Sequence, residues 1–146
     1  MGTYVTPAQV ASEARLGSSG FTSSTNPSDT KAGEIIQEVE AEVEAVLKAK
    51  YELPLVVSAN SYLVRGIALA LCAGRVRRII NINGNASGEQ NDFSKAEKEA
   101  RERLNSIMDG KLILHGETSA VSGGSMKGFV SNGDEDPVFQ RGVKQW

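Results

Sequence analysis

Apolar residues recur at helical spacing after Asp29. The stripe consists of aliphatic side chains three or four residues apart: Ile35, Ile36, Val39, Val43, Val46 and Leu47. Proline cannot continue a helix and restricts the residue before it, so Pro54 must follow the helix end. The pattern therefore predicts a helix that starts at Asp29 or Thr30 and ends one or two residues before Pro54. Its other faces carry five glutamates, at 34, 38, 40, 42 and 44, and we expect a mainly solvated surface there.

A second helical stretch is apolar nearly all round. It extends from Tyr62 to Ala73, which predicts the central and most buried helix of the fold. Ser58, Asn60 or Ser61 can cap its start, and we expect it to run to about Ile79. Small residues at 66, 70 and 74 lie four apart and would let another helix approach closely.

Capping signals predict two more helices, one before Asp29 and one after the third helix. Thr6, Pro7 and Gln9 form a capping box with proline at the first helical position, and that short helix should end by Leu16. A second capping box, from Ser94 to Glu97, predicts the start of the last helix, which Gly110 would end. The expected buried stripe of this last helix is Phe93, Ala96, Ala100, Leu104, Ile107 and Met108. Turn-rich segments at 17–28 and 81–91 would connect the helices.

These elements predict an all-α protein: a small bundle of about four helices with a long, irregular C-terminal arm. The helical body would cover residues 1–115, including the loop at 17–28, and the arm would cover 116–146. The arm is rich in Ser and Gly at 119–128, is acidic at 134–136, and then carries Val, Phe, Val and Trp. Such a composition cannot build a core alone, yet its apolar tip predicts a partner on which the arm becomes ordered.

Composition argues against catalysis. The chain has 146 residues and a net charge of −2, which fits one domain without an overall positive field. Cys72 is the only cysteine and lies in the apolar stretch, so we expect a small buried hydrophobe, and a disulfide within the chain is impossible. His115 is the only histidine and has no metal-ligand neighbours at suitable spacing. We therefore expect no enzyme activity, no cofactor, no metal and no membrane span, and synthesis in a reducing cytoplasm.

Arg75, Arg77 and Arg78 form a basic cluster near the predicted end of the third helix. Cations there complement the helix dipole, and guanidinium groups also pair well with carboxylates of another subunit. A nucleic-acid patch is a weaker interpretation, because the interleaved aromatic residues of a single-strand binder and a basic recognition helix are both missing.

An ordered set of motifs resembles the Mu-type head-tail joining proteins of long-tailed bacteriophages. In that family an aromatic residue precedes a Leu-Pro-Leu turn at the end of a long helix, as Tyr51 to Leu55 does here. An apolar, Ala-rich helix with arginines near its end follows at 63–78, and a charged helix closing in a hydrophobic-then-Gly step follows at 97–112. The family's arm ends in an apolar-Phe-x-Arg-Gly sequence, to which 138–142 is similar. The resemblance covers roughly 29–114 and the last ten residues.

The resemblance implies a non-enzymatic structural protein of the virion. It would form a ring, commonly of twelve copies, beneath the portal at the neck between head and tail. The implied partners are further copies of the chain, the portal protein, and a tail terminator or tail-completion protein. Genomic DNA would pass through the ring without sequence-specific binding, because an acidic lining offers phosphates nothing to bind.

Specific residues are assigned to these contacts. The predicted partner-binding residues are Arg75, Arg77, Arg78, Val138, Phe139, Arg141, Val143 and Trp146, and the predicted channel-facing residues are Glu38 and Glu42. The alternative is a small helical nucleic-acid-binding or regulatory protein that uses the three arginines of the third helix. An enzyme is a third interpretation, which the missing catalytic set disfavours.

Overall fold

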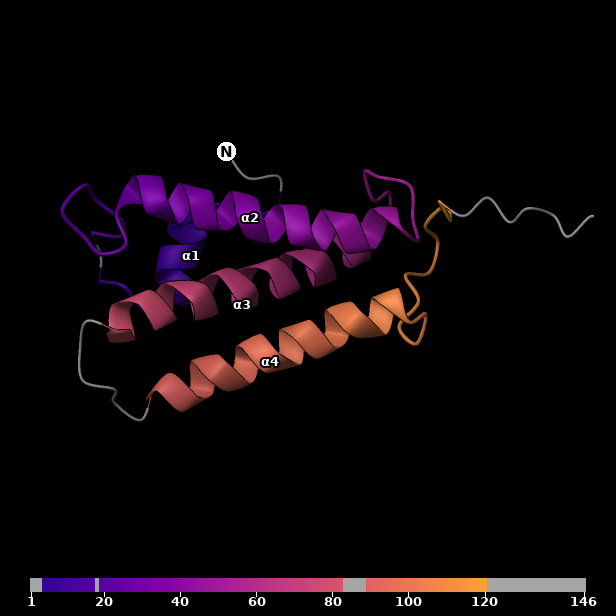
Figure 1. Cartoon of the computed structure of the whole chain (residues 1–146). Coiled ribbons are helices and arrows are strands. Elements are labelled where there is room, and N and C mark those ends of the chain that lie inside the picture. Colours follow the sequence, from indigo (N-terminus) through magenta and orange to yellow (C-terminus); the bar gives the residue numbers. More distant parts are fainter. Residues whose placement is uncertain (1–3, 18, 83–88, 121–146) are drawn as a thin grey trace, which may run out of the picture.

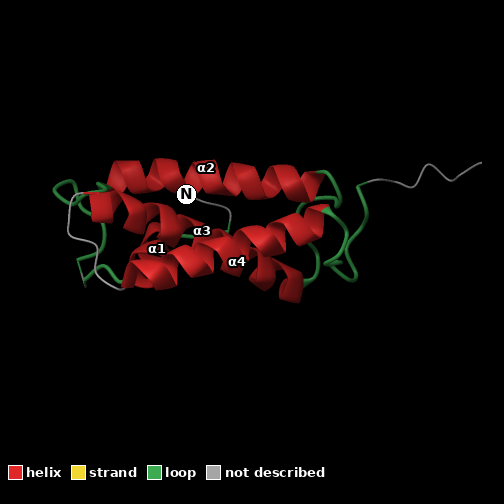
Figure 2. Cartoon of the chain, turned by 60° about the horizontal axis from the view of Figure 1, so that its bottom comes forward, coloured by secondary structure: helices red, strands yellow, loops and turns green. Residues whose placement is uncertain are grey.

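The computed structural model describes residues 4–17, 19–82 and 89–120, and four helices form there (Figure 1). They are α1 (Pro7–Glu13), α2 (Asp29–Lys48), α3 (Ser58–Ile82) and α4 (Glu89–Met108). The only β-type pairing among these described ranges is an isolated bridge, so the all-α prediction is confirmed. The three long helices lie side by side with α3 between α2 and α4, and the short α1 packs against α2 and α3 (Figures 1 and 2).

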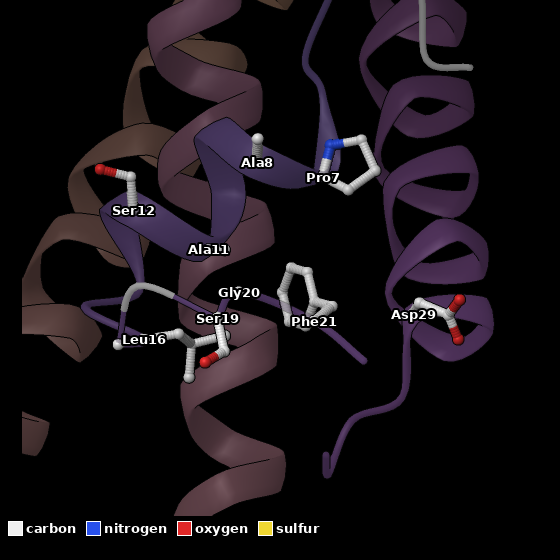
Figure 3. Close-up of a pocket in the computed structure, with 10 residues that line it drawn as sticks. Pro7, Ala8, Ala11, Ser12, Leu16, Ser19, Gly20, Phe21 and Asp29 are labelled. Carbon is white, nitrogen blue, oxygen red and sulfur yellow. The ribbon is translucent and has the colours of Figure 1, made fainter. Parts of the chain in front are cut away.

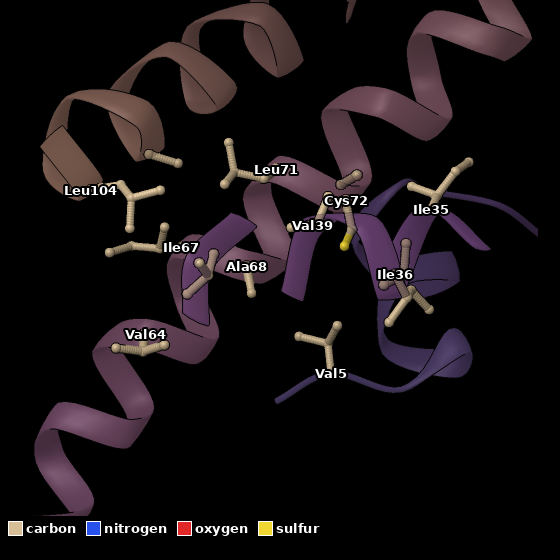
Figure 4. Close-up of a cluster of buried hydrophobic side chains, with 14 of the residues drawn as sticks. Val5, Ile35, Ile36, Val39, Val64, Ile67, Ala68, Leu71, Cys72 and Leu104 are labelled. Atoms are coloured by element: carbon tan, nitrogen blue, oxygen red, sulfur yellow. The ribbon is translucent and has the colours of Figure 1, made fainter. Parts of the chain in front are cut away.

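The core confirms that α3 is the central helix. It packs against all three other helices, and its buried side chains are Val64, Ile67, Ala68, Leu71, Cys72, Ala73 and Val76. Figure 4 shows this cluster meeting Ile35, Ile36 and Val39 of α2, Leu104 of α4 and Val5 before α1. Each helix turns its apolar stripe toward the others, and these contacts bury the residues that the periodicity predicted.

The capping prediction for α1 is also confirmed. The Thr6 hydroxyl accepts from the Gln9 N–H, and the Gln9 side chain accepts from the Thr6 N–H. The helix ends where Arg15 adopts a left-handed conformation (φ 51°) and the Leu16 N–H returns to the Ala11 carbonyl. This reversal places the Arg15 carbonyl against α3, which matters for the site described below.

Three predicted helix ends were wrong. α2 ends at Lys48, well before Pro54, and the chain from Lys50 to Glu52 instead pairs with residues 118–120. α4 begins at Glu89, so Ser94 lies inside the helix and does not cap it. α3 extends to Ile82 rather than about Ile79. The predicted loop at 81–91 is therefore shorter, and its centre, 83–88, lies outside the described residues.

The buried stripe of α4 lacks two predicted members, Ala96 and Met108, and gains one residue that was not predicted, Glu97. Ala96 is exposed and Met108 is 47% exposed, whereas Glu97 is only 6% exposed. Steps of four and three residues lead from Phe93 through Glu97 to Ala100 and onward, which is a regular helical stripe. The buried residue of this turn is thus the carboxylate Glu97 and not its neighbour Ala96, which the hydrophobic pattern had indicated.

The two glycines on the small-residue face of α3 differ in their surroundings. A Cβ added at Gly74 would lie 2.7 Å from Glu97 Oε2 and 2.9 Å from Glu97 Cβ, so close approach of α4 requires glycine there. Gly66 is exposed, and an added Cβ would meet nothing within 4 Å. Close packing therefore explains Gly74 but not Gly66.

The segment after α4 folds back onto the body. Gly110 takes a left-handed conformation (φ 75°) as predicted for the helix end. Leu114 is buried and its N–H donates to the Tyr51 hydroxyl at 3.0 Å, so the side chain of Leu114 packs this segment onto the helical body. The remainder of the predicted arm, 121–146, lies outside the described residues.

Candidate functional site

Six charged side chains form a continuous series of ion pairs across the three long helices. We call this group the charged seam; its members are Glu38 and Glu42 of α2, Arg75 and Arg78 of α3, and Glu97 and Arg101 of α4. Acids and bases alternate along it, and with three of each the seam is formally neutral. Charges that the sequence places on separate helices are therefore compensated within one molecule.

Arg75 and Arg101 connect α2 to the other helices. Arg75 Nη1 lies 3.4 Å from Glu38 Oε2, and its Nη2 donates to Glu42. Arg101 Nη1 lies 3.4 Å from the other oxygen of Glu42, and its Nη2 lies 3.3 Å from Glu97 Oε1. Glu42 is therefore shared by two arginines from two different helices.

Glu97 is the buried member of the seam. Its side chain is 8% exposed, and Arg78 Nη2 donates to both of its oxygens at 2.7 and 2.8 Å. Gly74 leaves the space in which this carboxylate sits. A buried carboxylate without partners would be costly, so Arg78 and Arg101 are what make this position tolerable.

The third predicted arginine, Arg77, binds elsewhere in the same molecule. Its Nη2 donates to the Arg15 carbonyl at 3.2 Å, and its guanidinium carbon lies 4.8 Å from the centroid of the Phe93 ring. The Arg15 guanidinium approaches the same ring at 5.4 Å. These cation–π contacts tie α1, α3 and the start of α4 together.

The structure thus brings together residues that the sequence analysis had assigned to different environments. Arg75 pairs with Glu38 and Glu42, although the arginine was assigned to a partner and the glutamates to a channel. Arg77 and Arg78 also have intramolecular partners. Their roles toward other molecules stay predictions. The predicted tip residues Val138, Phe139, Arg141, Val143 and Trp146 lie outside the described part of the chain.

A second organised feature is the root of the arm, by which we mean residues 116–120. The Glu52 N–H donates to the Thr118 carbonyl and the Ala120 N–H donates to the Lys50 carbonyl, both at 2.9 Å. This short antiparallel pairing, centred on Tyr51 and Ser119, binds the root to the segment after α2. The predicted boundary at 115/116 therefore falls before a stretch that is still hydrogen-bonded to the body.

Glu117 joins this root to the start of α3. Its two carboxylate oxygens accept from the N–H groups of Val56 and Val57 at 2.8 and 2.9 Å, and from the Asn60 side chain at 2.9 Å. Partial desolvation raises the pKa of this carboxyl, but the hydrogen bonds from Asn60, Val56 and Val57 outweigh it and leave the pKa below its usual value. α3 begins at Ser58, so Ser58, Asn60 and Ser61 lie inside the helix rather than before it. Glu117 binds the N–H groups of the two residues that precede the helix.

Two buried carboxylates were missed by the sequence analysis. Besides Glu97, Glu40 is 6% exposed and accepts from the N–H groups of Tyr4 and Val5 at 2.7 and 3.0 Å. It holds the segment before α1 against α2, so the acidic face of α2 is not wholly solvated as expected. The spacing of Glu40 from Ile36 and Val43, four residues before and three after, is the signal that could have indicated burial.

No set of catalytic groups is assembled in the part of the chain that the structure describes. Cys72 is buried, and desolvation raises the pKa of its thiol to about 12, so it is no nucleophile at neutral pH. His115 is exposed, and within the described ranges no three metal-binding side chains gather. An open pocket between α1 and the following loop is lined mainly by small or apolar residues with Asp29 at its edge (Figure 3). Among the described helices, none is long and apolar enough to cross a membrane.

No protein-family model, no curated protein and no solved structure matches this chain.

Proposed function

We propose that this protein is a head-to-tail adaptor of a long-tailed bacteriophage: a structural subunit that forms a ring beneath the portal and extends the DNA channel toward the tail. The ordered set of motifs from Tyr51 to the last ten residues supports the family assignment. The observation that carries the proposal is the anchored root of the arm. It gives the segment after Ala120 a fixed starting point at one end of a rigid helical body.

An anchored root suits a protein that assembles through an arm. An adhesive segment contributes to specific assembly only if its starting point and direction are set by the folded body. Leu114, Glu117 and the pairing with residues 50–52 set that starting point through an apolar contact, a carboxylate and backbone hydrogen bonds. The apolar tip at 138–146 then supplies the contact to the portal or to an adjacent subunit.

The charged seam refines the proposed roles of its members. Glu38 is 61% exposed and Glu42 is 35% exposed, so Glu38 is the better candidate for a surface along which DNA passes. Arg78 is also 61% exposed while it holds Glu97, so it can contact a neighbouring subunit without leaving its own partner. Arg75 is more buried than Arg78, with 24% of its side chain exposed, and we propose that it acts mainly within the subunit.

The test is a mass measurement of the purified protein alone and mixed with the portal protein of the same phage. We expect a discrete ring on the portal, and loss of portal binding when residues 137–146 are deleted. The matched control replaces Ala96, which is exposed on α4, with serine, and it should assemble normally. Portal binding by the truncated chain equal to that of the full chain would overturn the assigned role of the tip.

The alternative, a small nucleic-acid-binding or regulatory protein, rests on the three arginines of α3. All three already bind carboxylates, a carbonyl or an aromatic ring of the same molecule, which gives this alternative less support. Tight, salt-dependent binding of DNA by the isolated monomer would favour it over the adaptor.

A further inference from the structure

One end of the bundle carries the large apolar side chains that are exposed within the described residues. They are Val56 (80% exposed), Tyr62 (68%), Ile113 (56%) and Met108 (47%). All four belong to the end at which α2 and α4 finish and α3 begins (Figure 1). Single exposed apolar residues are ordinary, but their concentration at one end indicates a surface that is covered by something.

Val56 and Tyr62 lie on an open groove of about 430 Å³. Its other lining residues are Tyr4, Ser58, Ser61 and Arg65. Arg65 is half-buried, and no carboxylate among the described residues pairs with it. The groove therefore combines an apolar part with a cation whose charge is not compensated within the described body.

The chain leaves the body directly beside this groove. Glu117 binds the N–H of Val56, a lining residue, at 2.8 Å, and Ala120 follows three residues later. From Ala120, the next acidic cluster is at 134–136, and the apolar residues Val138 and Phe139 follow it after Pro137. The thirteen residues between Ala120 and Asp134 make fourteen residue-to-residue steps, which can span up to roughly 50 Å, so a return to the groove needs no full extension.

We infer that residues 134–146 dock into the Val56–Tyr62–Arg65 groove of the same molecule. The carboxylates at 134–136 would pair with Arg65, and Val138 and Phe139 would cover Val56 and Tyr62. The order of acidic then apolar residues in this segment matches the cationic and apolar parts of the groove. The tether raises the effective concentration of the segment to the millimolar range, so a contact too weak to join two molecules is sufficient here.

Docking in this way would shield the adhesive tip in the free subunit. A partner of the tip must then displace it from the groove, which restrains association until that partner is present. This inference does not rest on the proposed adaptor function, because it concerns the isolated chain alone.

Trp146 makes the inference directly measurable, because it is the only tryptophan of the protein. In the full-length chain we expect its fluorescence to be blue-shifted and shielded from a soluble quencher. Replacing Val56 and Tyr62 with serine should return emission and quenching to those of an unfolded chain. Both side chains are largely exposed, so the helical circular dichroism should not change. The control Ala96→Ser alters an exposed residue in the N-terminal half of α4 and should leave the fluorescence unchanged.

Charge variants and dilution complete the test. Arg65→Glu should release the tip, and Arg65→Lys should retain it, with a larger difference at low salt than at high salt. The shift should be independent of protein concentration. A blue shift that grows with concentration, together with a doubled mass in light scattering, would place a second copy in the groove and overturn the inference. Emission of a fully exposed tryptophan in the unmodified chain would overturn it as well.

Discussion

Replacing Gly74 with alanine tests whether α4 packs on α3 as closely as the seam requires. The added Cβ would lie 2.9 Å from Glu97 Cβ and 2.7 Å from Glu97 Oε2. The carboxylate oxygen can rotate away, but the Cβ of Glu97 moves only with α4 itself. Alanine favours the helix over glycine by about 1 kcal/mol, whereas overpacking costs about 1–3 kcal/mol. We therefore expect a net loss of about 0–2 kcal/mol in the free energy of unfolding.

Gly66→Ala is the matched control, because it makes the same chemical change in the same helix. Nothing lies within 4 Å of the added Cβ, so we expect a gain of about 0.4–1 kcal/mol from reduced unfolded-state entropy. The two variants should differ by about 1–3 kcal/mol, or roughly 4 °C in Tm for each kcal/mol, measured by circular dichroism during thermal and urea unfolding. In a Glu97→Ala background most of the penalty at Gly74 should remain, because alanine keeps the Cβ that lies 2.9 Å from the added methyl group. Equal stabilisation by the two glycine replacements would refute the close approach of α4.

Three further predictions follow from other parts of the structure. Leu71→Ala should destabilise the fold by about 2–5 kcal/mol in urea unfolding because Leu71 is fully buried, and half-buried Leu69 should cost less; a loss below about 1 kcal/mol at both would mean that α3 is not central. The raised pKa of the Cys72 thiol, about 12, predicts negligible reaction with a thiol reagent at neutral pH until the protein unfolds, so rapid labelling of the native chain would contradict its burial. Because the pKa of Glu117 is lowered in the folded state, its carboxylate stabilises the fold at pH values above the ordinary carboxyl pKa. This stabilisation is lost as the pH falls through the folded-state pKa. Amide-exchange protection of Glu52 and Ala120, corrected for intrinsic rates, should therefore fall in acid, and Glu117→Gln should remove this pH dependence; an unchanged profile in the variant would exclude Glu117 as the cause.

The intramolecular partners of the arginines change how an assembly experiment must be designed. Replacing Arg75, Arg77 and Arg78 together with Glu would place a like charge beside Glu97 and Glu42, so the subunit itself would be destabilised. Ring assembly can then be interpreted only for variants that keep their stability. Arg78→Lys is the more informative single change, because a lysine keeps the charge beside Glu97 but cannot present a planar guanidinium to a neighbour.

Periodicity and capping chemistry determined the helical class, the order of the helices and the central place of α3. These features depend on residues three or four positions apart, so the sequence of a single segment is enough to predict them. The capping box at Thr6 and the helix end at Gly110 belong to the same local category. The arrangement of the apolar stripe on α2 was likewise visible in the sequence.

Only the tertiary structure decided which charges are buried and where two of the helices stop. Glu97 lies at a core position because Gly74 leaves it space and arginines from α3 and α4 neutralise it, contacts that no local window contains. α2 ends at Lys48 because the chain from Lys50 onward pairs with residues nearly seventy positions later. Helix phase and long-range pairing depend on the free energy of the whole bundle, so isolated segments cannot specify them.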